Sequence, residues 1–330
     1  MEIDFVVTWV DMNDPEWRKT FAEHKGIIDN SKNETTEARF RDYGLLKYWF
    51  RGVEKFAPWV RKVHFVTCGQ KPEWLNADHP KLNLVDHKDY MPAEFLPCFN
   101  SNVIEIYMHR IAGLSEHFVY FNDDFFLIDD TLIERFFQDG LPCDIAAFRI
   151  NAGTGLWNQM LRNNIRVINS RFDKREVMAR DYDKWFFAGY GKRLRLTKLL
   201  RGYKKFTCLR TPHNAQPYLR TTFDQVWDYA GEELTRMSAN RFRTGQDLSL
   251  ELFKTWQICE SNFVPYNTYD DTKMFSLVVR WKAAIEAIRE QKYKLVCLND
   301  SPHIRNFDEM MRGLTGAFDS ILPEKSGFEK

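Results

Sequence analysis

The chain has 330 residues, which is enough to bury a substantial hydrophobic core in one large domain or two modest ones. Its charges nearly cancel at a net +1, which excludes the strong overall positive field of nucleic-acid-binding proteins, so nucleic acid is not an expected partner. The six cysteines are scattered without a CxxC pair, which indicates buried reduced thiols rather than a zinc site or a disulfide framework. The first residues do not read as a signal peptide and no apolar run is long enough to span a bilayer, so we expect a cytoplasmic location.

In the first half of the chain, apolar runs with the composition of buried strands alternate with helical apolar spacing. The expected strands are residues 5–10, 63–67 and 82–85, and a fourth run that starts at 117 and ends at Asp123 and Asp124. The expected helices are residues 37–55 and 101–114. This alternation predicts an α/β fold, Rossmann-like and GT-A-like, in which a mostly parallel sheet is flanked by helices.

The second half of the chain is less regular. Residues 167–210 mix basic and aromatic side chains, and the spacing of apolar residues predicts a helix over 246–256. A further strand is expected over 292–298, ending in the polar turn that contains Asp300. The polar tail from 323 to 330 is expected to fray.

Two adjacent carboxylates, Asp123 and Asp124, end the fourth expected strand. Because an unpaired buried carboxylate is strongly disfavoured, we expect them to face a cleft and to hold a hard divalent cation that grips a phosphate-bearing substrate. In a parallel α/β sheet the ligand crevice lies at the carboxyl ends of the strands, where Asp11 and Asp14 are also expected. The alternative is an ordinary polar turn at the end of a strand.

Four blocks of the sequence, in order along the chain, resemble the motifs of one known family. The first block is 4–14, the second runs through 39–42, 56–61, 66–76, 109–115 and 121–124, the third is 212–218 with 243–247 downstream, and the fourth is 297–300. These blocks resemble the Stealth family, which includes bacterial capsule hexose-1-phosphate transferases and the animal lysosomal N-acetylglucosamine-1-phosphotransferase. They span nearly the whole chain, although none of them covers the basic segment near 170–205.

The resemblance implies transfer of a sugar-1-phosphate from a UDP-sugar, either a UDP-N-acetylhexosamine or a UDP-hexose, to a hydroxyl of a glycan acceptor in capsule or exopolysaccharide biosynthesis. The acceptor attacks the phosphorus that bears the sugar, a phosphodiester forms, and UMP leaves. The alternative is a metal-dependent GT-A glycosyltransferase that releases UDP. A third hypothesis, a non-catalytic carbohydrate-binding protein, rests on the aromatic content of 15% alone.

This function predicts a single catalytic domain over residues 1–330. We expect an α/β half over 1–150 that binds the nucleotide sugar, and a helical segment over 151–210 that faces the acceptor or a membrane. Residues 211–330 would complete the catalytic core.

The resemblance also assigns roles to residues that carry the chemistry of phosphoryl transfer. The expected ligands of Mg²⁺ or Mn²⁺ are Asp124, Asn299 and Asp300, with Asp123 as a further ligand or an orienting group. His213 is expected to take the proton of the acceptor hydroxyl, because a neutral histidine suits this role near neutral pH. The alternative for His213 is an ordinary surface histidine.

Arg243 is the expected clamp on the diphosphate, since its planar guanidinium matches phosphate oxygens. Arg243, His213 and Asp124 form the predicted catalytic set. The alternative for Arg243 is an ion pair with Asp247, which lies four residues further along the chain.

Six residues are expected to bind the substrate. They are Trp9, Asp11, Asn13, Asp14, Arg110 and Asn122. The loop of Asp11, Asn13 and Asp14 follows the first strand, where a uridine or ribose would dock, although aspartate and asparagine also favour simple turns. Arg110 could reach a phosphate, and its alternative is a structural ion pair.

The basic and aromatic segment has three interpretations. It is a solvated helical face, an electrostatic contact with the anionic inner face of the plasma membrane, or a cradle for a lipid-linked glycan acceptor. The last two are compatible, because capsule intermediates are built on a membrane lipid. We therefore expect a protein that is cytoplasmic and makes peripheral contact with the membrane.

Overall fold

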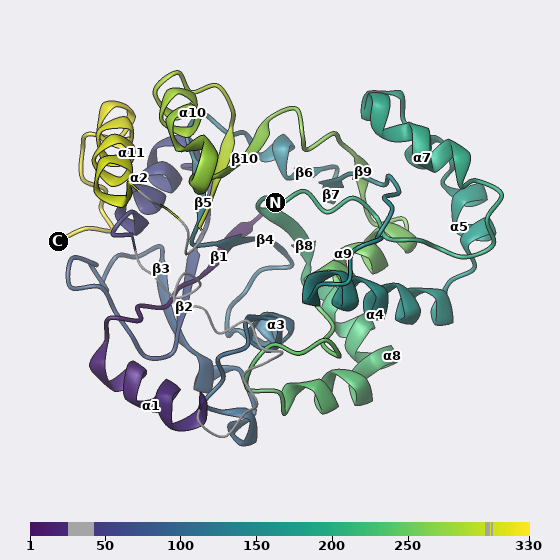
Figure 1. Ribbon diagram of the computed structural model, residues 1–330, viewed down its shortest axis with the longest axis horizontal. Coiled ribbons are helices and arrows are strands. Elements are labelled where there is room, and N and C mark those ends of the chain that lie inside the picture. The colour runs from purple at the N-terminus through teal and green to yellow at the C-terminus, as the bar shows by residue number, and fades with distance from the viewer. Residues whose placement is uncertain (26–42, 301–303, 305) are drawn as a thin grey trace.

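A five-stranded sheet forms the centre of the protein in the computed structural model, which describes residues 1–25, 43–300, 304 and 306–330 (Figure 1). Its strands in spatial order are β3 (Leu82–Asp86), β2 (Val63–Thr67), β1 (Ile3–Thr8), β4 (His117–Asn122) and β8 (Gln216–Leu219). The first four are parallel, and β8 runs antiparallel beside β4. The predicted α/β fold with a mostly parallel sheet is confirmed.

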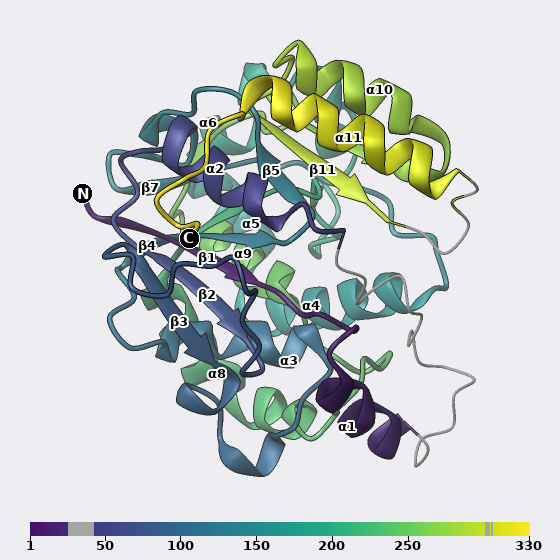
Figure 2. The same ribbon diagram turned by 90° about the vertical axis from the view of Figure 1, so that its left-hand side faces the viewer.

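Helices cover both faces of this sheet (Figure 2). They are α1 (Pro15–Lys25), α2 (Leu46–Phe56), α3 (Ser101–Ile106), α4 (Leu156–Arg171), α5 (Lys174–Arg180), α6 (Tyr182–Trp185), α7 (Leu194–Leu199), α8 (Arg220–Ser238), α9 (Leu250–Cys259), α10 (Leu277–Arg289) and α11 (Phe307–Ile321). Two small sheets complete the fold. One is formed by β10 (Thr272–Ser276), β11 (Leu295–Asn299) and β5 (Phe125–Leu127), and the other by β6 (Phe137–Gln138), β7 (Leu141–Asp144) and β9 (Val264–Pro265).

The alternation of side chains along the central strands divides the core into two layers. Phe5 and Val7 of β1 point into a layer formed with α2, α10 and α11, whereas Val6 points into a layer formed with α3, α8 and α9. In β4, Phe121 belongs to the first layer and Phe118 to the second. Because both faces of these strands are covered, the strands read in sequence as continuous apolar runs.

The segment 151–210 is helical, as predicted, and it shares the second core layer with the sheet. Trp185 and Tyr190 are fully buried there. The Lys174 ammonium is also buried and donates to the carbonyls of Leu200 and Tyr203. Part of the basic character of this segment therefore serves its own folding.

Several predicted boundaries shift in the structure. The first strand begins and ends two residues earlier than expected, at Ile3 and Thr8. The helix predicted over 101–114 ends at Ile106 and is followed by one 3-10 turn, and Gly113 has a φ of 77°, which no right-handed helix accommodates. The start of the helix predicted over 37–55 lies outside the described residues, and α2 covers its second part.

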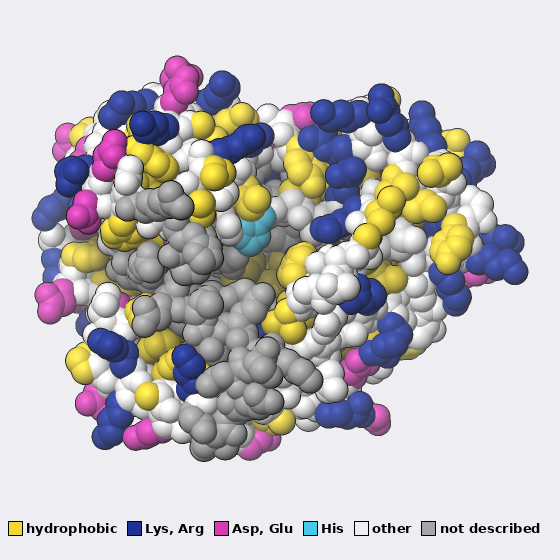
Figure 3. All heavy atoms as spheres, in the orientation of Figure 1, with side chains coloured by type: hydrophobic (Ala, Val, Ile, Leu, Met, Phe, Trp, Pro, Cys, Tyr) yellow, Lys and Arg dark blue, Asp and Glu magenta, His cyan; other side chains and the backbone are white. Residues whose placement is uncertain are grey.

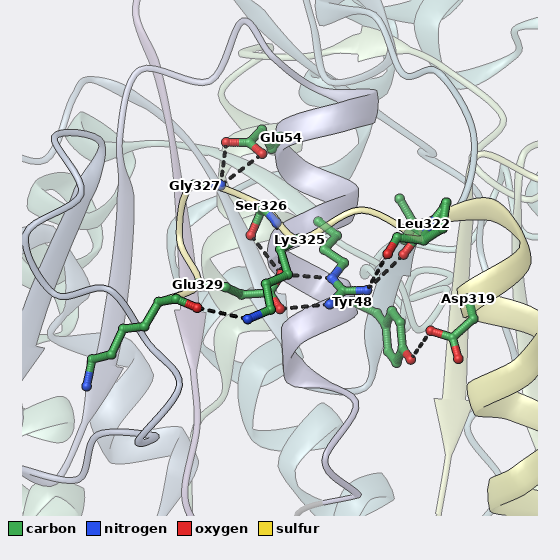
Figure 4. Close-up of polar contacts among 11 residues, drawn as sticks. Tyr48, Glu54, Asp319, Leu322, Lys325, Ser326, Gly327 and Glu329 are labelled. Atoms are coloured by element: carbon green, nitrogen blue, oxygen red, sulfur yellow. Dashed lines mark hydrogen bonds and ion pairs between the residues drawn. The ribbon is translucent and has the colours of Figure 1, made fainter.

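The prediction that the tail over 323–330 frays is wrong (Figure 4). Arg51 of α2 donates to both carboxylate oxygens of Glu329 at 2.8 Å, and Tyr48 donates to Asp319 at 2.5 Å. The ring of Phe328 is 1% exposed in the first core layer. An apolar anchor and a bidentate ion pair thus dock the tail against α2, a tertiary effect that local polarity does not reveal.

Candidate active site

The polar residues predicted to act together follow the carboxyl ends of neighbouring strands. Thr8 at the end of β1 pairs in register with Asn122 of β4 and with Val66 of β2. The connection from β1 runs through α2 on one face of the sheet, whereas α3 leads into β4 on the other face. The β1–β4 boundary is therefore a topological switch point, where α/β proteins bind their ligands.

A turn after β4 brings two distant strands together at this edge. Asp123 and Asp124 form the turn between β4 and β5, and β5 pairs antiparallel with β11. The amide of Leu298 in β11 donates to the carbonyl of Asp124 at 2.9 Å. Asn299 and Asp300 follow Leu298 directly, so the second and fourth sequence blocks meet here.

Three side chains from separate parts of the chain meet beside this turn, and we call Asp124, His213 and Cys297 the Asp124 cluster. His213 Nε2 lies 3.7 Å from Asp124 Oδ2, and the Cys297 thiol donates to the same oxygen at 3.3 Å. The rings of Phe125 and His213 meet edge to face, with centroids 4.8 Å apart. The structure thus brings together Asp124 and His213, as the sequence predicted, and adds Cys297.

The environment of His213 favours a strong base. Burial lowers the pKa of His213, but the nearby Asp124 carboxylate and the charge of Glu251 together raise it by more, so the net pKa lies above the ordinary histidine value. At 3.7 Å this is an electrostatic interaction rather than a hydrogen bond. The His213 side chain is 42% exposed, so a substrate can reach it.

The carboxylate of Asp124 has the free capacity that a cation ligand requires. Its Oδ1 atom is buried and accepts no hydrogen bond from any residue that the structure describes. A buried carboxylate oxygen without a hydrogen bond is costly unless a ligand binds it, so the site fits a hard divalent cation. Because Asp123 and Asp124 lie in a turn, the alternation of side chains along a strand does not direct them to opposite faces.

Arg243 lies at the end of a buried polar network rather than in the ion pair weighed from the sequence. Its guanidinium donates to Ser101 Oγ at the start of α3, and Ser101 in turn hydrogen-bonds Glu105. Tyr120 of β4 donates to Glu105 Oε1 at 3.0 Å. Burial raises the pKa of Glu105 to about 7, although Arg243 and these hydrogen bonds oppose the shift.

The alternative partner of Arg243, Asp247, is occupied elsewhere. It is fully buried and accepts from Asn100, Asn240 and Thr244. Among the described residues no ion pair joins Asp247 to Arg243. The guanidinium contributes instead to the electrostatic environment of His213, which keeps it a candidate for binding the substrate.

The loop after β1 is fixed by its own hydrogen bonds and by Gln70. Asp11 accepts from the amide of Asn13, and Asp14 caps α1 by accepting from the amides of Glu16 and Trp17. The side chain of Gln70 accepts from the amide of Asp11 and donates to the carbonyl of Asp11. It also donates to Asp14 Oδ2. These hydrogen bonds, with burial opposing them, lower the pKa of Asp14.

A pocket of about 480 Å³ opens beside this loop, and we call it the β2–β3 pocket. It is lined by Asp14, Glu16, Trp17 and Thr20, by 68–70 after β2, by 86–88 after β3, and by 96–99. Gly69 has a φ of 88° there, a conformation that favours glycine. The pocket and the Asp124 cluster thus lie along the same edge of the sheet, over different strands.

Two residues predicted to bind substrate have other partners. The Trp9 ring is 7% exposed and lies 5.6 Å from the Phe65 ring in the first core layer, so most of its surface packs in the core. The Arg110 guanidinium lies 4.8 Å from the rings of both Tyr107 and Trp227. These cation–π contacts fix its position among the described residues.

Sequence reasoning missed Cys297 and Glu105 as members of the site region. Cys297 was interpreted as an inert buried thiol because it lies in an apolar strand, and it is indeed fully buried. Its place directly before Leu298, Asn299 and Asp300 was the available signal. Glu105 carried no local signal, because only the fold brings it to Tyr120.

Comparison with known proteins places the chain in a class of transferases. The model of Stealth protein CR2, conserved region 2, matches residues 39–143. The chain is 38% identical to the capsular polysaccharide phosphotransferase WcwK of Streptococcus pneumoniae over 99% of both chains, and 39% identical to the receptor polysaccharide phosphotransferase WefC of Streptococcus gordonii, also over 99% of both. The exopolysaccharide phosphotransferase cps2G of Lactiplantibacillus plantarum is 37% identical over 100% of this chain and 96% of its own.

The protein is therefore an enzyme of the phosphotransferase type that acts in polysaccharide biosynthesis. The chain belongs to the Stealth family. The apo structure of the bifunctional glycosyltransferase WbbM aligns with 97% of this chain and 51% of that one at 8% identity, but its TM-score of 0.40 is too low to carry an argument. None of the helices in the described parts of the chain has the length and apolar character to cross a membrane.

Proposed function

We propose that the protein transfers sugar-1-phosphate from a UDP-sugar to a hydroxyl of a glycan acceptor and releases UMP. The observation that carries this proposal is the Asp124 cluster. His213, a candidate base, lies 3.7 Å from the Asp124 carboxylate, whose Oδ1 accepts no hydrogen bond from the described residues. Phosphoryl transfer needs a positioned nucleophile and neutralised phosphate charge. His213 would supply the base that activates the nucleophile, and Asp124 would supply a ligand for the cation that neutralises the charge. The phosphotransferase relatives support the same reaction class.

In the proposed reaction the acceptor O–H gives its proton to His213, and its oxygen forms a bond to the phosphorus that carries the sugar. The bond from that phosphorus to the bridging oxygen breaks, and the electron pair leaves with UMP. Asp124 would hold Mg²⁺ or Mn²⁺ together with Asn299, Asp300 or Asp123, and such an ion would supply charge neutralisation on the nonbridging oxygens. Arg243 lies near enough to His213 to contribute to its electrostatic environment and would bind the diphosphate.

The nucleoside would occupy the β2–β3 pocket, with the loop of Asp11, Asn13 and Asp14 beside it. Neighbouring strands are about 4.8 Å apart, so the end of β2 lies roughly 10 Å from the end of β4, a span that a ribose and a diphosphate bridge. Asn122 at the end of β4 would then face the diphosphate.

The identity of the nucleotide product tests the proposal. The enzyme is incubated with UDP-N-acetylhexosamine, Mg²⁺ and a glycan acceptor, and the nucleotides are separated by chromatography. UMP is expected, formed in equal amount with a phosphodiester in the glycan and abolished by a chelator until Mg²⁺ is restored. Release of UDP with a phosphorus-free linkage would contradict the proposal and favour a glycosyltransferase.

We further propose that the protein works in the cytoplasm against the anionic inner face of the plasma membrane, on a lipid-linked acceptor. Residues 184–223 contain no Asp or Glu. Figure 3 shows Lys and Arg side chains gathered with hydrophobic ones on the side where α5 and α7 lie. Leu199 and Tyr203 are 78% and 58% exposed beside this charge. Such a mixture suits an anionic lipid surface.

Vesicle binding tests this surface. Each basic residue near a membrane contributes about 1 kcal/mol, so the triple variant Lys198→Glu, Arg201→Glu, Lys204→Glu should lose at least roughly 100-fold in affinity for anionic vesicles. The control reverses Lys282 and Arg289, which are exposed on α10. Equal binding of both variants to the vesicles would contradict a membrane role for the α5–α7 surface.

A further inference from the structure

The Asp124 cluster has the donor set of a zinc site as well as one oxygen ligand of a magnesium site. Cys297 contributes a sulfur, His213 a ring nitrogen and Asp124 a carboxylate oxygen, and all three atoms lie within 4.8 Å of one another. Sulfur and imidazole ligands favour Zn²⁺ and related ions, whereas Mg²⁺ binds oxygen. Sequence reasoning did not include Cys297 in the site, because its thiol lies in an apolar strand far along the chain from Asp124 and His213.

Two of the three distances between these atoms are close to those of tetrahedral coordination. Bonds of about 2.0 Å to oxygen or nitrogen and about 2.3 Å to sulfur place neighbouring zinc ligands roughly 3.3–3.6 Å apart. In the structure, Asp124 Oδ2 lies 3.3 Å from Cys297 Sγ and 3.7 Å from His213 Nε2. Because all three atoms lie within 4.8 Å of one another, rotation of these side chains can bring them to one ion.

The surrounding fold holds the ligands in place. The backbone bond from Leu298 to Asp124 fixes the turn against β11, next to Cys297. The ring of Phe125 supports the imidazole edge to face. A site that needs little rearrangement loses little ordering entropy on binding.

An ion can also reach the cluster. The side chains of His213 and Asp124 are 42% and 26% exposed, whereas Cys297 is buried at the base of the cluster. Three protein ligands with one exposed side leave a fourth position for water or a phosphate oxygen, the arrangement of an open zinc site.

We propose that Asp124, His213 and Cys297 bind Zn²⁺, and that this binding reversibly inhibits the transferase. The Cys297 thiol proton is released to solvent as the sulfur–zinc bond forms. The bound ion occupies the nitrogen lone pair of His213, so no base remains for the acceptor proton. It also occupies Asp124, so it competes with the hard cation. The inhibition rests on the proposed function, whereas the binding does not.

The binding is tested without substrate, using Co²⁺ as a coloured substitute for Zn²⁺. Wild-type protein should bind one Co²⁺ with a sulfur-to-cobalt charge-transfer band that Zn²⁺ abolishes. Cys297→Ser should lack this band and bind Zn²⁺ at least about tenfold more weakly, since even loss of a group that only orients a ligand costs this much. Cys68→Ser is the control, because Cys68 is the most accessible of the six thiols.

A band that survives in Cys297→Ser, or is lost in Cys68→Ser, would overturn the site. Thermal unfolding without metal identifies a folding defect in Cys297→Ser, and His213→Gln then serves as the second variant, with the same expected loss of affinity. Zn²⁺ should inhibit UMP release by the wild type, with recovery on chelation and restoration of Mg²⁺. Zinc binding without inhibition would overturn the inhibitory role alone, whereas absence of any UMP with intact cobalt binding would count against the proposed function.

Discussion

Aspartates at the two edges of the central sheet have opposite surroundings. At the amino edge, Asp4 is fully buried and accepts from the Arg61 guanidinium, from His64 at 3.0 Å and from the amide of Ser115 at 2.8 Å. At the carboxyl edge, Asp124 is partly exposed. Its Oδ2 accepts a hydrogen bond from the Cys297 thiol, and its Oδ1 accepts no hydrogen bond from the described residues.

This difference separates structural from functional carboxylates. All of the hydrogen-bonding capacity around Asp4 is used by the fold itself, so its charge contributes to stability. Asp124 retains capacity that the fold does not use, which is what a ligand for a cation or substrate requires. Substitution of Asp4 should therefore lower stability, whereas substitution of Asp124 should lower activity.

The largest expected effect is on activity at the carboxyl edge. Asp124→Asn should lower the rate of UMP formation by at least about 100-fold, as removal of a transition-state contact does, while the free energy of unfolding changes little. Asp130→Asn, the same change at an exposed position, is the control. Near-full activity of Asp124→Asn across a range of Mg²⁺ concentrations would remove Asp124 from the proposed site.

His213→Gln should cause a loss of similar size, because general-base catalysis contributes about 100-fold or more. The Gln side chain keeps a polar group beside Asp124 but cannot take a proton. Steady-state kinetics should show the loss in kcat. An unchanged kcat with a raised KM would mean that His213 binds substrate without acting as the base.

At the amino edge the expected effect is on stability. Asp4→Asn leaves Arg61 and His64 without their buried charge partner, which should lower the free energy of unfolding by about 3–5 kcal/mol, while activity per folded molecule is retained. Glu2→Gln is the control, since Glu2 faces the same Arg61 but is 75% exposed. Loss of activity in folded Asp4→Asn protein would break the contrast between the edges.

The pH dependence of Asp4→Asn sharpens this test. Burial opposes ionisation of Asp4, but His64, Arg61 and Ser115 lower its pKa below the ordinary value of 3.8. A carboxylate with a lowered pKa stabilises the fold above that value, and this contribution is lost as the pH falls through the folded-state pKa. The difference between wild type and variant in denaturant unfolding should therefore be full at neutral pH and shrink in acid.

A smaller effect of opposite sign is expected from Glu105, which lies behind the carboxyl edge. Its pKa of about 7 in the folded protein exceeds the ordinary value of 4.5, so its contribution to stability is present at low pH and is lost as the pH rises through 7. Glu105→Gln should escape this loss and gain about 1–3 kcal/mol on wild type between pH 5 and pH 8. Denaturant unfolding at both pH values measures it, with the exposed Glu94→Gln as the control, and a constant difference would contradict the buried acid.

The smallest expected effect is at Arg110, which the sequence placed with the substrate. Its contacts with Tyr107 and Trp227 contribute about 0.5–1 kcal/mol at an exposed site, so Arg110→Ala should cost that much stability and leave kcat unchanged. A large loss of activity with retained stability would restore the substrate role.

The features that could be predicted from the sequence are those that depend on where the strands end. The parallel sheet follows from periodicity, and the polar residues after its strands follow from the rule that ligands bind at carboxyl edges. The meeting of His213 with Asp124 needed the family resemblance, because the two residues are 89 positions apart.

What the sequence could not give depends on packing. The sequence does not show where the ring of Trp9 packs, and only the fold places it 5.6 Å from the ring of Phe65. The docking of the tail depends on Arg51 and Glu329, which are far apart in the chain. Cys297 could not be assigned from the sequence for the same reason. A buried thiol can bind a metal only if the fold places other ligands beside it, and the sequence does not show those neighbours.

The central claim is that the carboxyl edge transfers a phosphoryl group together with the sugar. A UDP-sugar labelled at the β-phosphorus, incubated with wild-type enzyme, Mg²⁺ and acceptor, tests it most directly. We predict that the label appears in the glycan, that unlabelled UMP is released, and that both products fall together in Asp124→Asn. Label that stays with the released nucleotide as UDP would contradict the account.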